Sequence, residues 1–249
     1  MRARGRFAWP RTLAVAAALV VPCAGARGAD VPGNLALPLP TATPSRLLSQ
    51  VEGTYGWYLR GDVGYRFQRI GAASSSDTAV VPAPTASKLD NDFMGGYGIG
   101  YQWSWLRLDL TGDYGGRSKY DGTTASGTTL TGQVETFTAL LNGYVDLGTW
   151  AGLTPYVGAG IGGAHTIFSN YSNSAAVAPM AASATPEHQW NLAWAATGGV
   201  SYTIARDFLV DVSYRHIDMG DVRGGPVGDL TLKHFTGDEV RVGFRYILD

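Results

Sequence analysis

The sequence predicts an all-β fold, an eight-stranded antiparallel transmembrane β-barrel with short periplasmic turns and long extracellular loops. Three observations support this prediction. Runs of strand length alternate apolar and polar residues, the connections between the runs are alternately short and long, and aromatic residues gather near the ends of the runs. In a barrel that crosses a membrane, apolar side chains face lipid, polar side chains turn inward, and the long loops lie on one side.

The composition argues against several other classes of protein. The chain has 249 residues, 34 of them glycine, and a formal net charge of −1. Its mean hydropathy of −0.02 argues against a bundle of membrane-spanning helices. A net charge near zero gives no reason to expect nucleic acid as a partner.

The N-terminal segment is typical of a signal peptide, which we assign to residues 1–29. Four arginines precede an apolar run at 13–21, and an A-x-A cleavage site follows at 24–26, with Gly28 and Ala29 as alternative positions. The single Cys23 lies within this segment, so cleavage at the A-x-A site would leave no thiol. A lipoprotein would carry its lipid on this cysteine, but the preceding Pro22 fits such a site poorly.

Two further parts follow the signal peptide. Residues 30–55 are rich in proline and show no periodicity, which is typical of an extended linker, here in the periplasm. Residues 56–249 form the predicted barrel domain. We expect its strands near 57–69, 93–103, 105–115, 133–147, 153–167, 189–203, 207–218 and 238–248.

The connections between these strands alternate in length. Short ones are expected at Ser104, at 148–152 and at Ala205–Arg206. Long ones are expected at 70–92, 116–132, 168–188 and 219–237. A soluble sandwich has no need of this alternation, whereas an outer-membrane barrel has tight turns in the periplasm and long loops outside.

Aromatic residues near the strand ends predict two girdles at the depth of the lipid headgroups. The principal members are Trp57, Trp103, Trp105, Trp150, Trp190 and Tyr246; Phe67, Phe93, Tyr114 and Phe168 accompany Trp190 at the extracellular side.

The polar face of the strands carries charges of both signs. In the first strand Arg60, Asp62 and Arg66 alternate with apolar residues, so they point into the barrel. An eight-stranded barrel is just wide enough for side chains to fill, so unpaired charges would be costly and paired ones would close the lumen. The predicted ion-pair network contains Arg60, Asp62, Arg66, Arg107, Asp109, Asp211, Arg215, Glu239, Arg241 and Arg245, and Asp113 and Asp146 also point inward.

Three motifs resemble a known family: GWYLRGDVGYRF (56–67), YVDLGTW with LTPYVGAGIG (144–150 and 153–162), and YRHIDMGDV (214–222). They are similar to the small outer-membrane β-barrel proteins of alphaproteobacteria, a porin family related to the opacity-type surface antigens and the OmpA transmembrane domain. The resemblance covers about 56–249. It implies an eight-stranded barrel with a periplasmic N-terminus, partnered by outer-membrane lipids, lipopolysaccharide and the barrel assembly machinery.

The resemblance also implies roles in envelope integrity and host-surface contact, and some members are associated with haemin binding. The chain departs from the family in one respect. Such barrels commonly end in Phe, which the assembly machinery recognises, whereas this chain ends in FRYILD with Tyr246 as the last aromatic residue. Either Tyr246 substitutes for it or assembly is less efficient.

Candidate chemistry is sparse, and we expect no enzyme and no cofactor. Gly158, Gly160 and Gly163 match G-x-G-x-x-G, but a dinucleotide site needs a helix next, and strand and loop follow. A lipid A-modifying enzyme would need a serine beside His216, and no serine of the same predicted strand lies on the same face as this histidine. Loop residues that could ligate haem iron if the loops converge are His188, His234, Tyr171 and Met180.

The sequence therefore predicts a Gram-negative outer-membrane protein with a structural, envelope-integrity and surface-contact role, its lumen plugged by ion pairs. A narrow porin for small solutes and a haemin-binding or adhesive surface protein remain as alternatives.

Overall fold

The computed structural model describes residues 55–75, 84–174, 182–183, 186–224 and 230–248. The predicted signal peptide, the linker apart from Tyr55, and Met180 lie outside the described residues. No helix in the described ranges is long and apolar enough to cross a membrane.

The described residues form β-strands joined by turns and short connections. Their bounds are β1 (Gly56–Ser75), β2 (Pro84–Leu89), β3 (Asp92–Trp103), β4 (Leu106–Thr124), β5 (Thr129–Asp146), β6 (Leu153–Asn173), β7 (Ala182–Ser183), β8 (Glu187–Ala205), β9 (Phe208–Asp218), β10 (Val222–Gly224) and β11 (Leu230–Ile247).

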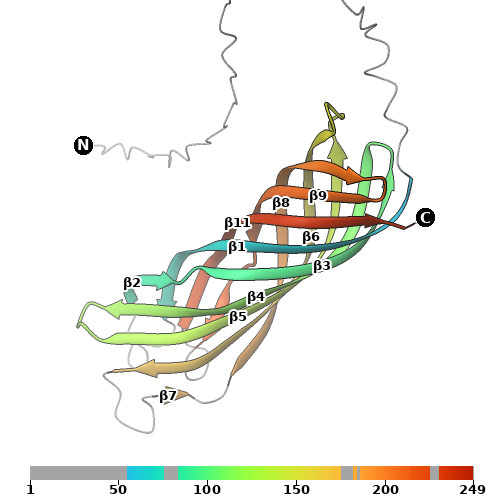
Figure 1. Ribbon diagram of the computed structural model, residues 1–249. Helices are drawn as coiled ribbons and strands as arrows, with labels where there is room; N and C mark the ends of the chain where they lie inside the picture. Colours follow the sequence, from blue (N-terminus) through green and yellow to red (C-terminus); the bar gives the residue numbers. More distant parts are fainter. Residues whose placement is uncertain (1–54, 76–83, 175–181, 184–185, 225–229, 249) are drawn as a thin grey trace, which may run out of the picture. The chain divides into compact units, whose positions relative to one another are not determined.

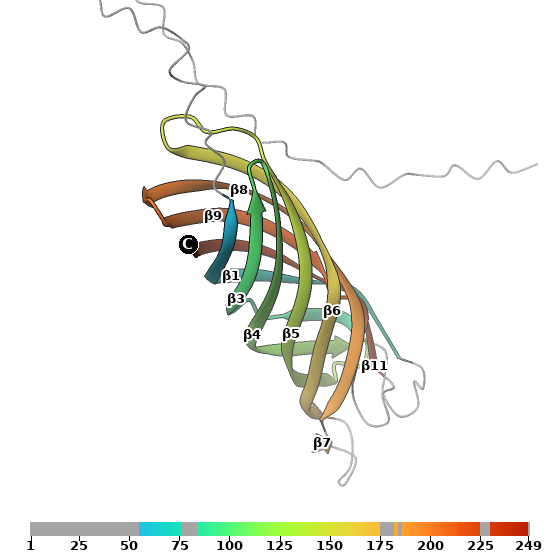
Figure 2. The ribbon, with the colours of Figure 1, turned by 90° about the vertical axis from the view of Figure 1, so that its right-hand side faces the viewer.

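Eight of these strands form a closed antiparallel ring in the order β1-β3-β4-β5-β6-β8-β9-β11. The ring closes because β11 pairs with β1 from Tyr58↔Ile247 to Ser75↔Leu230, and Figure 1 shows the two strands side by side. Figure 2 shows β4, β5 and β6 following one another around the wall. The predicted eight-stranded barrel is confirmed.

One end of the ring has tight turns, as predicted. β3 and β4 are joined by Ser104 and Trp105, and β8 and β9 by Arg206 and Asp207. Ser104 adopts a φ of 44°, a left-handed conformation that tight hairpins require.

At the other end, the strands run further than predicted. The expected loop at 116–132 is largely strand, because β4 continues to Thr124, β5 begins at Thr129 and only residues 125–128 connect them. The short strands β2, β7 and β10 pair with β4, β6 and β11 and extend the wall.

These extensions escaped prediction because the polarity of the two faces inverts along the strands. In the half of β4 near the tight turns, Leu108 and Leu110 are exposed outside and Asp109 is buried inside. In the half near the long connections, Lys119 is exposed and Tyr120 is buried. Above the lipid the outer face meets water, so the apolar residues turn inward.

The interior accordingly has two parts. The half near the tight turns contains buried arginines and carboxylates. The half near the long connections contains an apolar cluster, which we call the outer cap: Leu89, Tyr120, Leu130, Val134, Leu140, Ala164, Phe168, Tyr171, Ala193, Ala195, Ile217, Met219, Val222, Leu230, Leu232 and Phe235.

Candidate functional site

The outer face carries the predicted aromatic residues. All six principal members of the girdles are exposed, namely Trp57, Trp103, Trp105, Trp150, Trp190 and Tyr246. The prediction for Phe168 was wrong, since its side chain is buried in the outer cap. Counting by twos from the exposed Ile161 places residue 168 on the inner face, so the alternation itself could have corrected this.

The barrel interior is the candidate functional site. Each of the ten predicted network residues has a side chain at most 8% exposed and takes part in at least one ion pair. Side chains from β1, β4, β9 and β11 meet across the lumen, which brings together residues more than a hundred positions apart, such as Asp113 and Arg241.

Near the tight turns, two arginines lie against tyrosine rings. Arg107 Nη2 lies 2.7 Å from Asp146 Oδ1, and its guanidinium lies 4.5 Å from the ring centre of Tyr156 and 5.0 Å from that of Tyr144. Arg245 donates from Nε and Nη2 to Asp211 at 3.1 and 3.0 Å, and its guanidinium lies 5.5 Å from the ring centre of Tyr58. The aromatic faces help to stabilise these charges away from water.

In the middle of the lumen, the Asp109 carboxylate accepts hydrogen bonds from three side chains. Tyr58 Oη donates to it at 3.0 Å, Arg60 Nη1 at 2.8 Å and Asn142 Nδ2 at 2.8 Å. Arg60 also binds Asp62 through two parallel hydrogen bonds of 2.9 and 2.8 Å. This fork geometry is the strong form of the arginine–carboxylate contact.

Glu239 and Asp113 form the upper part of the network. Glu239 accepts from Arg66 Nε at 2.7 Å, Arg215 Nε at 2.7 Å and Arg241 Nη1 at 3.3 Å. Asp113 accepts from Arg215 Nη2 at 2.8 Å and Arg241 Nη2 at 2.6 Å. The two carboxylates and three guanidiniums therefore form one connected cluster.

Glycines on the inner face make room for these long side chains. A Cβ on Gly100 would lie 2.6 Å from Asp109 Cβ, and one on Gly158 would meet the ring of Tyr144. The Gly-rich motif of β6 thus serves packing against Tyr144 and Asn142, and the chain continues as strand to Asn173 without the helix that a dinucleotide site requires.

Sequence reasoning missed several members of the network. Asp92 lies inside and accepts from Gln68 Nε2 at 2.7 Å. Asp92 was missed because the predicted strand began one residue later, at 93. If that strand is extended by one residue, Asp92 lies on the same face as the buried Met94. Among the described side chains, Arg66 Nη1 and Nη2 and Asp92 Oδ2 are buried without a hydrogen-bond partner. Nothing in the sequence signalled the roles of Tyr144 and Tyr156.

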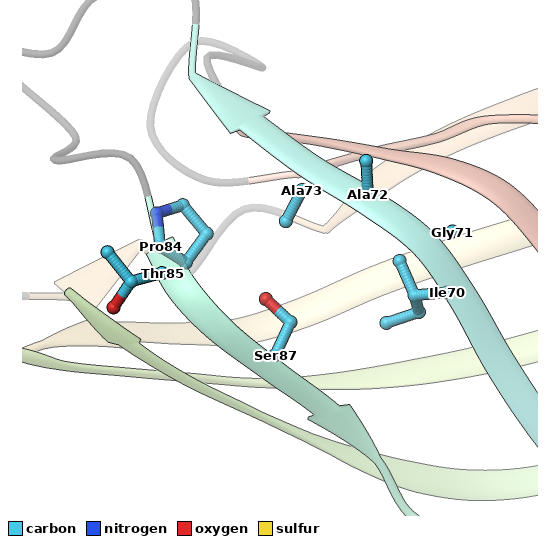
Figure 3. A pocket seen from close by; sticks show the side chains of 7 residues that line it. All are labelled: Ile70, Gly71, Ala72, Ala73, Pro84, Thr85 and Ser87. Atoms are coloured by element: carbon cyan, nitrogen blue, oxygen red, sulfur yellow. The ribbon is translucent and has the colours of Figure 1, made fainter. Parts of the chain in front are cut away.

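At the outer end, the wall parts between β1 and β2, an interval that we call the seam. β1 pairs with β3 only as far as Arg66↔Asp92, where Asn91 Oδ1 accepts from the Gln68 backbone N–H at 3.2 Å. Above this point, within the described part of the chain, β1 pairs only with β11, and β2 only with β4. A cavity of about 170 Å³ lies between them, and Figure 3 shows its lining: Ile70, Gly71, Ala72, Ala73, Pro84, Thr85 and Ser87.

The described haem candidates lie in different surroundings. Tyr171 was predicted in a loop, but it lies in β6 with its side chain buried in the outer cap. His188 is exposed on β8 and stacks on His165, with ring centres 5.6 Å apart. His234 is exposed on β11. Tyr171 therefore faces the interior, whereas His188 and His234 are exposed, so the convergence that a haem site would require is not seen among these three residues.

His216 lies on the outer face, as the alternation predicted. Its Nδ1 is 2.8 Å from Asp238 Oδ1, which also accepts from Tyr214 Oη at 2.7 Å. Arg69 Nη1 lies 3.1 Å from Asp238 Oδ2. The carboxylate partner is thus Asp238, on the neighbouring strand, and the arrangement is a small interfacial polar cluster.

Comparison with known sequences gives one family. The profile of the outer membrane protein beta-barrel domain matches residues 50–247. An uncharacterized protein of Brucella suis is 30% identical over 192 residues, which cover 65% of this chain and 67% of that protein. Outer membrane protein PagN of Salmonella typhimurium is 33% identical over 107 residues, 43% of this chain and 41% of PagN.

Solved structures show the same fold. The outer membrane protein OprG from Pseudomonas aeruginosa matches with a TM-score of 0.50 at 14% identity, covering 78% of this chain and 97% of OprG. The outer membrane protein AlkL, determined in lipid bilayers, matches with a TM-score of 0.50 at 16% identity, covering 90% and 97%.

Proposed function

Because the chain belongs to the outer membrane protein beta-barrel family, and so to the Gram-negative outer membrane, we propose that it acts there as a closed barrel with a structural and surface-contact role. The observation that supports this proposal is the set of buried ion pairs and buried apolar side chains along the interior. The half of the lumen near the tight turns contains the ion pairs of six arginines, and the half near the long connections contains the apolar outer cap.

A solute would have to break this interior in order to pass. The guanidiniums of Arg215 and Arg241 bridge Asp113 on β4 to Glu239 on β11, across the lumen. Separating buried pairs of this kind costs several kcal/mol for each uncompensated charge, on the order of 3–5 kcal/mol. The closed lumen favours a mechanical and surface role over the porin alternative.

The surface part of the role rests on the outer end. The strands continue above the girdles and present polar side chains such as Arg117, Lys119 and Lys88 to water. A rigid wall of this kind positions the connecting segments for contact with other surfaces. The haemin alternative has less support, since Tyr171 lies inside the barrel and His188 outside.

Two measurements test the proposal. First, the purified protein in planar bilayers should give no steady conductance above that of protein-free bilayers; a stable single-channel current would overturn the closed lumen and support the narrow porin. Second, a deletion strain should admit a detergent and a large hydrophobic dye, and the full chain should restore the barrier. An unaltered envelope in the deletion strain would refute the integrity role.

A further inference from the structure

A second opening in the wall lies between β8 and the β9–β10 segment. Among the described residues, β8 pairs with β9 only from Trp194 to Ala205, and the part of β8 before Trp194 pairs only with β6. Asn191 Nδ2 and Gln189 Nε2 reach across the interval to the Asp221 backbone oxygen, at 2.7 and 3.1 Å. An outward pocket of about 690 Å³, which we call the rim pocket, results; Trp190, Leu192, Trp194, Asp218, Asp221 and Arg223 line it.

The apolar wall of the rim pocket is a pair of indole rings on one strand. Trp190 is 67% exposed and Trp194 is 47% exposed, with the exposed Leu192 between them. Each ring is in tilted contact with an imidazole: between ring centres, His165 lies 4.8 Å from Trp190 at an interplanar angle of 37°, and His216 lies 5.7 Å from Trp194 at 55°. The rings are therefore held in place and still offer exposed surface.

The polar wall carries oriented carboxylates. Asp218 Oδ1 accepts from the Gly220 backbone N–H at 2.9 Å, and Asp221 Oδ1 accepts from the His234 backbone N–H at 2.9 Å. These bonds fix both carboxylates, while the other oxygen of each has no hydrogen bond to the described residues. Arg223 is exposed and forms no ion pair within the described part of the chain.

The charged groups determine which ligands fit. Two carboxylates, one guanidinium and the imidazole of His234 line the pocket, so with a neutral imidazole the balance is negative and an anion such as a phosphate group is disfavoured. A neutral sugar fits both walls. The C–H face of a pyranose ring packs on the negative face of an indole, and its hydroxyl groups donate to carboxylates and accept from a guanidinium.

We propose that the rim pocket binds neutral sugar residues of the glycolipid in the outer leaflet of the same membrane. The position of the pocket supports this source. Trp194 is in register with Ile161, an exposed apolar residue of the lipid-facing band, so the floor of the pocket continues into that band. A glycolipid anchored beside the barrel would present its sugars at this height and at high effective concentration. The inference does not depend on whether the lumen conducts.

The test uses the full mature protein refolded in detergent and titrated by calorimetry. The probe is the core oligosaccharide released by mild acid from the lipopolysaccharide of the producing bacterium, with its phosphates removed and the carboxyl groups of its acidic sugars reduced, so that it is neutral. We expect Trp190→Ala to weaken binding roughly tenfold, since one stacking contact contributes up to about that factor. Asp218→Asn should weaken binding several-fold while its amide oxygen still accepts from Gly220. Trp105→Ala, at the opposite end, removes an equally exposed indole and should change nothing.

Four outcomes would overturn the inference: no binding by the unaltered protein at millimolar oligosaccharide, equal binding by all three variants, tighter binding of the phosphorylated oligosaccharide, or equally tight binding of unrelated neutral oligosaccharides. The last would place the source outside the membrane. The heat-dependent shift in gel mobility verifies that each variant is folded before titration, and Asp218→Asn keeps the test decisive if Trp190→Ala fails to fold.

Discussion

Glu239→Gln tests whether the buried ion pairs hold this barrel together. The substitution keeps the shape of a side chain that is 0% exposed but removes its charge and one acceptor oxygen. The Nε–H···Oε1 contact to Glu239 is the one hydrogen bond that the side chain of Arg66 makes to described residues, because its Nη1 and Nη2 have no partner. If the amide nitrogen replaces Oε1, Arg66 loses that bond; if it replaces Oε2, Arg215 and Arg241 lose theirs.

The magnitude follows from this geometry. One lost charge-assisted hydrogen bond corresponds to about 1.5–3 kcal/mol. The buried positive charge left in excess raises the total to about 3–5 kcal/mol. We expect the free energy of unfolding, from urea titrations in lipid vesicles followed by tryptophan fluorescence, to fall by that amount.

The matched control is Glu135→Gln, the same change in an ion pair on the outer face. Its partner Arg117 has a side chain 70% exposed, so the loss should stay below about 1 kcal/mol. If both variants lose the same amount, the interior pairs contribute no more than surface pairs and the reasoning fails. As a further check, Arg66→Met added to Glu239→Gln should recover part of the loss, because it removes the charge left without a partner.

Three further predictions concern other parts of the interior. Arg107→Ala should lower the temperature of the folded-to-unfolded gel shift, because Asp146 loses its partner and Tyr144 and Tyr156 lose the packed guanidinium; an unchanged temperature would count against the network. Gly100→Ala should prevent correct folding, since its Cβ would lie 2.6 Å from both Asp109 Cβ and the Leu108 backbone oxygen, whereas Gly198→Ala, with open space around it, should fold normally in the same refolding assay. Phe235→Ala in the outer cap should cost about 3–5 kcal/mol in urea titrations, while Lys119→Ala, on the exposed outer face of the same end, should cost less than about 1 kcal/mol; equal losses would show that the cap does not contribute as a packed core.

The sequence was sufficient to predict the ring of eight strands and the inward face of each, because alternation within a membrane is strict. It located the ten network residues inside the barrel for the same reason. It could not specify which arginine meets which carboxylate, since partners such as Arg215 and Asp113 are set by strand tilt and register across the lumen. Single-strand periodicity contains no information about that register.

The outer cap escaped prediction for a different reason. A rule that assigns apolar residues to lipid makes Tyr120, Leu130 and Phe235 look irregular, and the polar residues between them suggest a loop. The rule holds only while lipid lies outside. Once the outer face meets water, the same alternation has to be interpreted with the opposite polarity, and the predicted loops then become strands.

Backbone pairing indicates where this change of surroundings occurs. At the seam, the facing edges of β1 and β2 have no ladder partner among the residues that the structure describes. Such edges cannot lie in hydrocarbon, because lipid satisfies no backbone hydrogen bond. The outer boundary of the hydrocarbon therefore lies no higher than the end of the β1–β3 ladder at Arg66↔Asp92. The polarity changes at the same level, since the exposed Phe67 is followed outside by the exposed Arg69.

Two independent features thus place the outer cap above the membrane, where water drives its burial. Lipid outside the lower half removes that driving force, because apolar side chains gain nothing by moving from lipid to an interior. The directional contacts of the ion pairs then specify a unique interior in the lower half, as close packing of apolar side chains does above it. One barrel therefore combines a charged interior, where lipid surrounds its strands, with an apolar interior, where water surrounds the same strands.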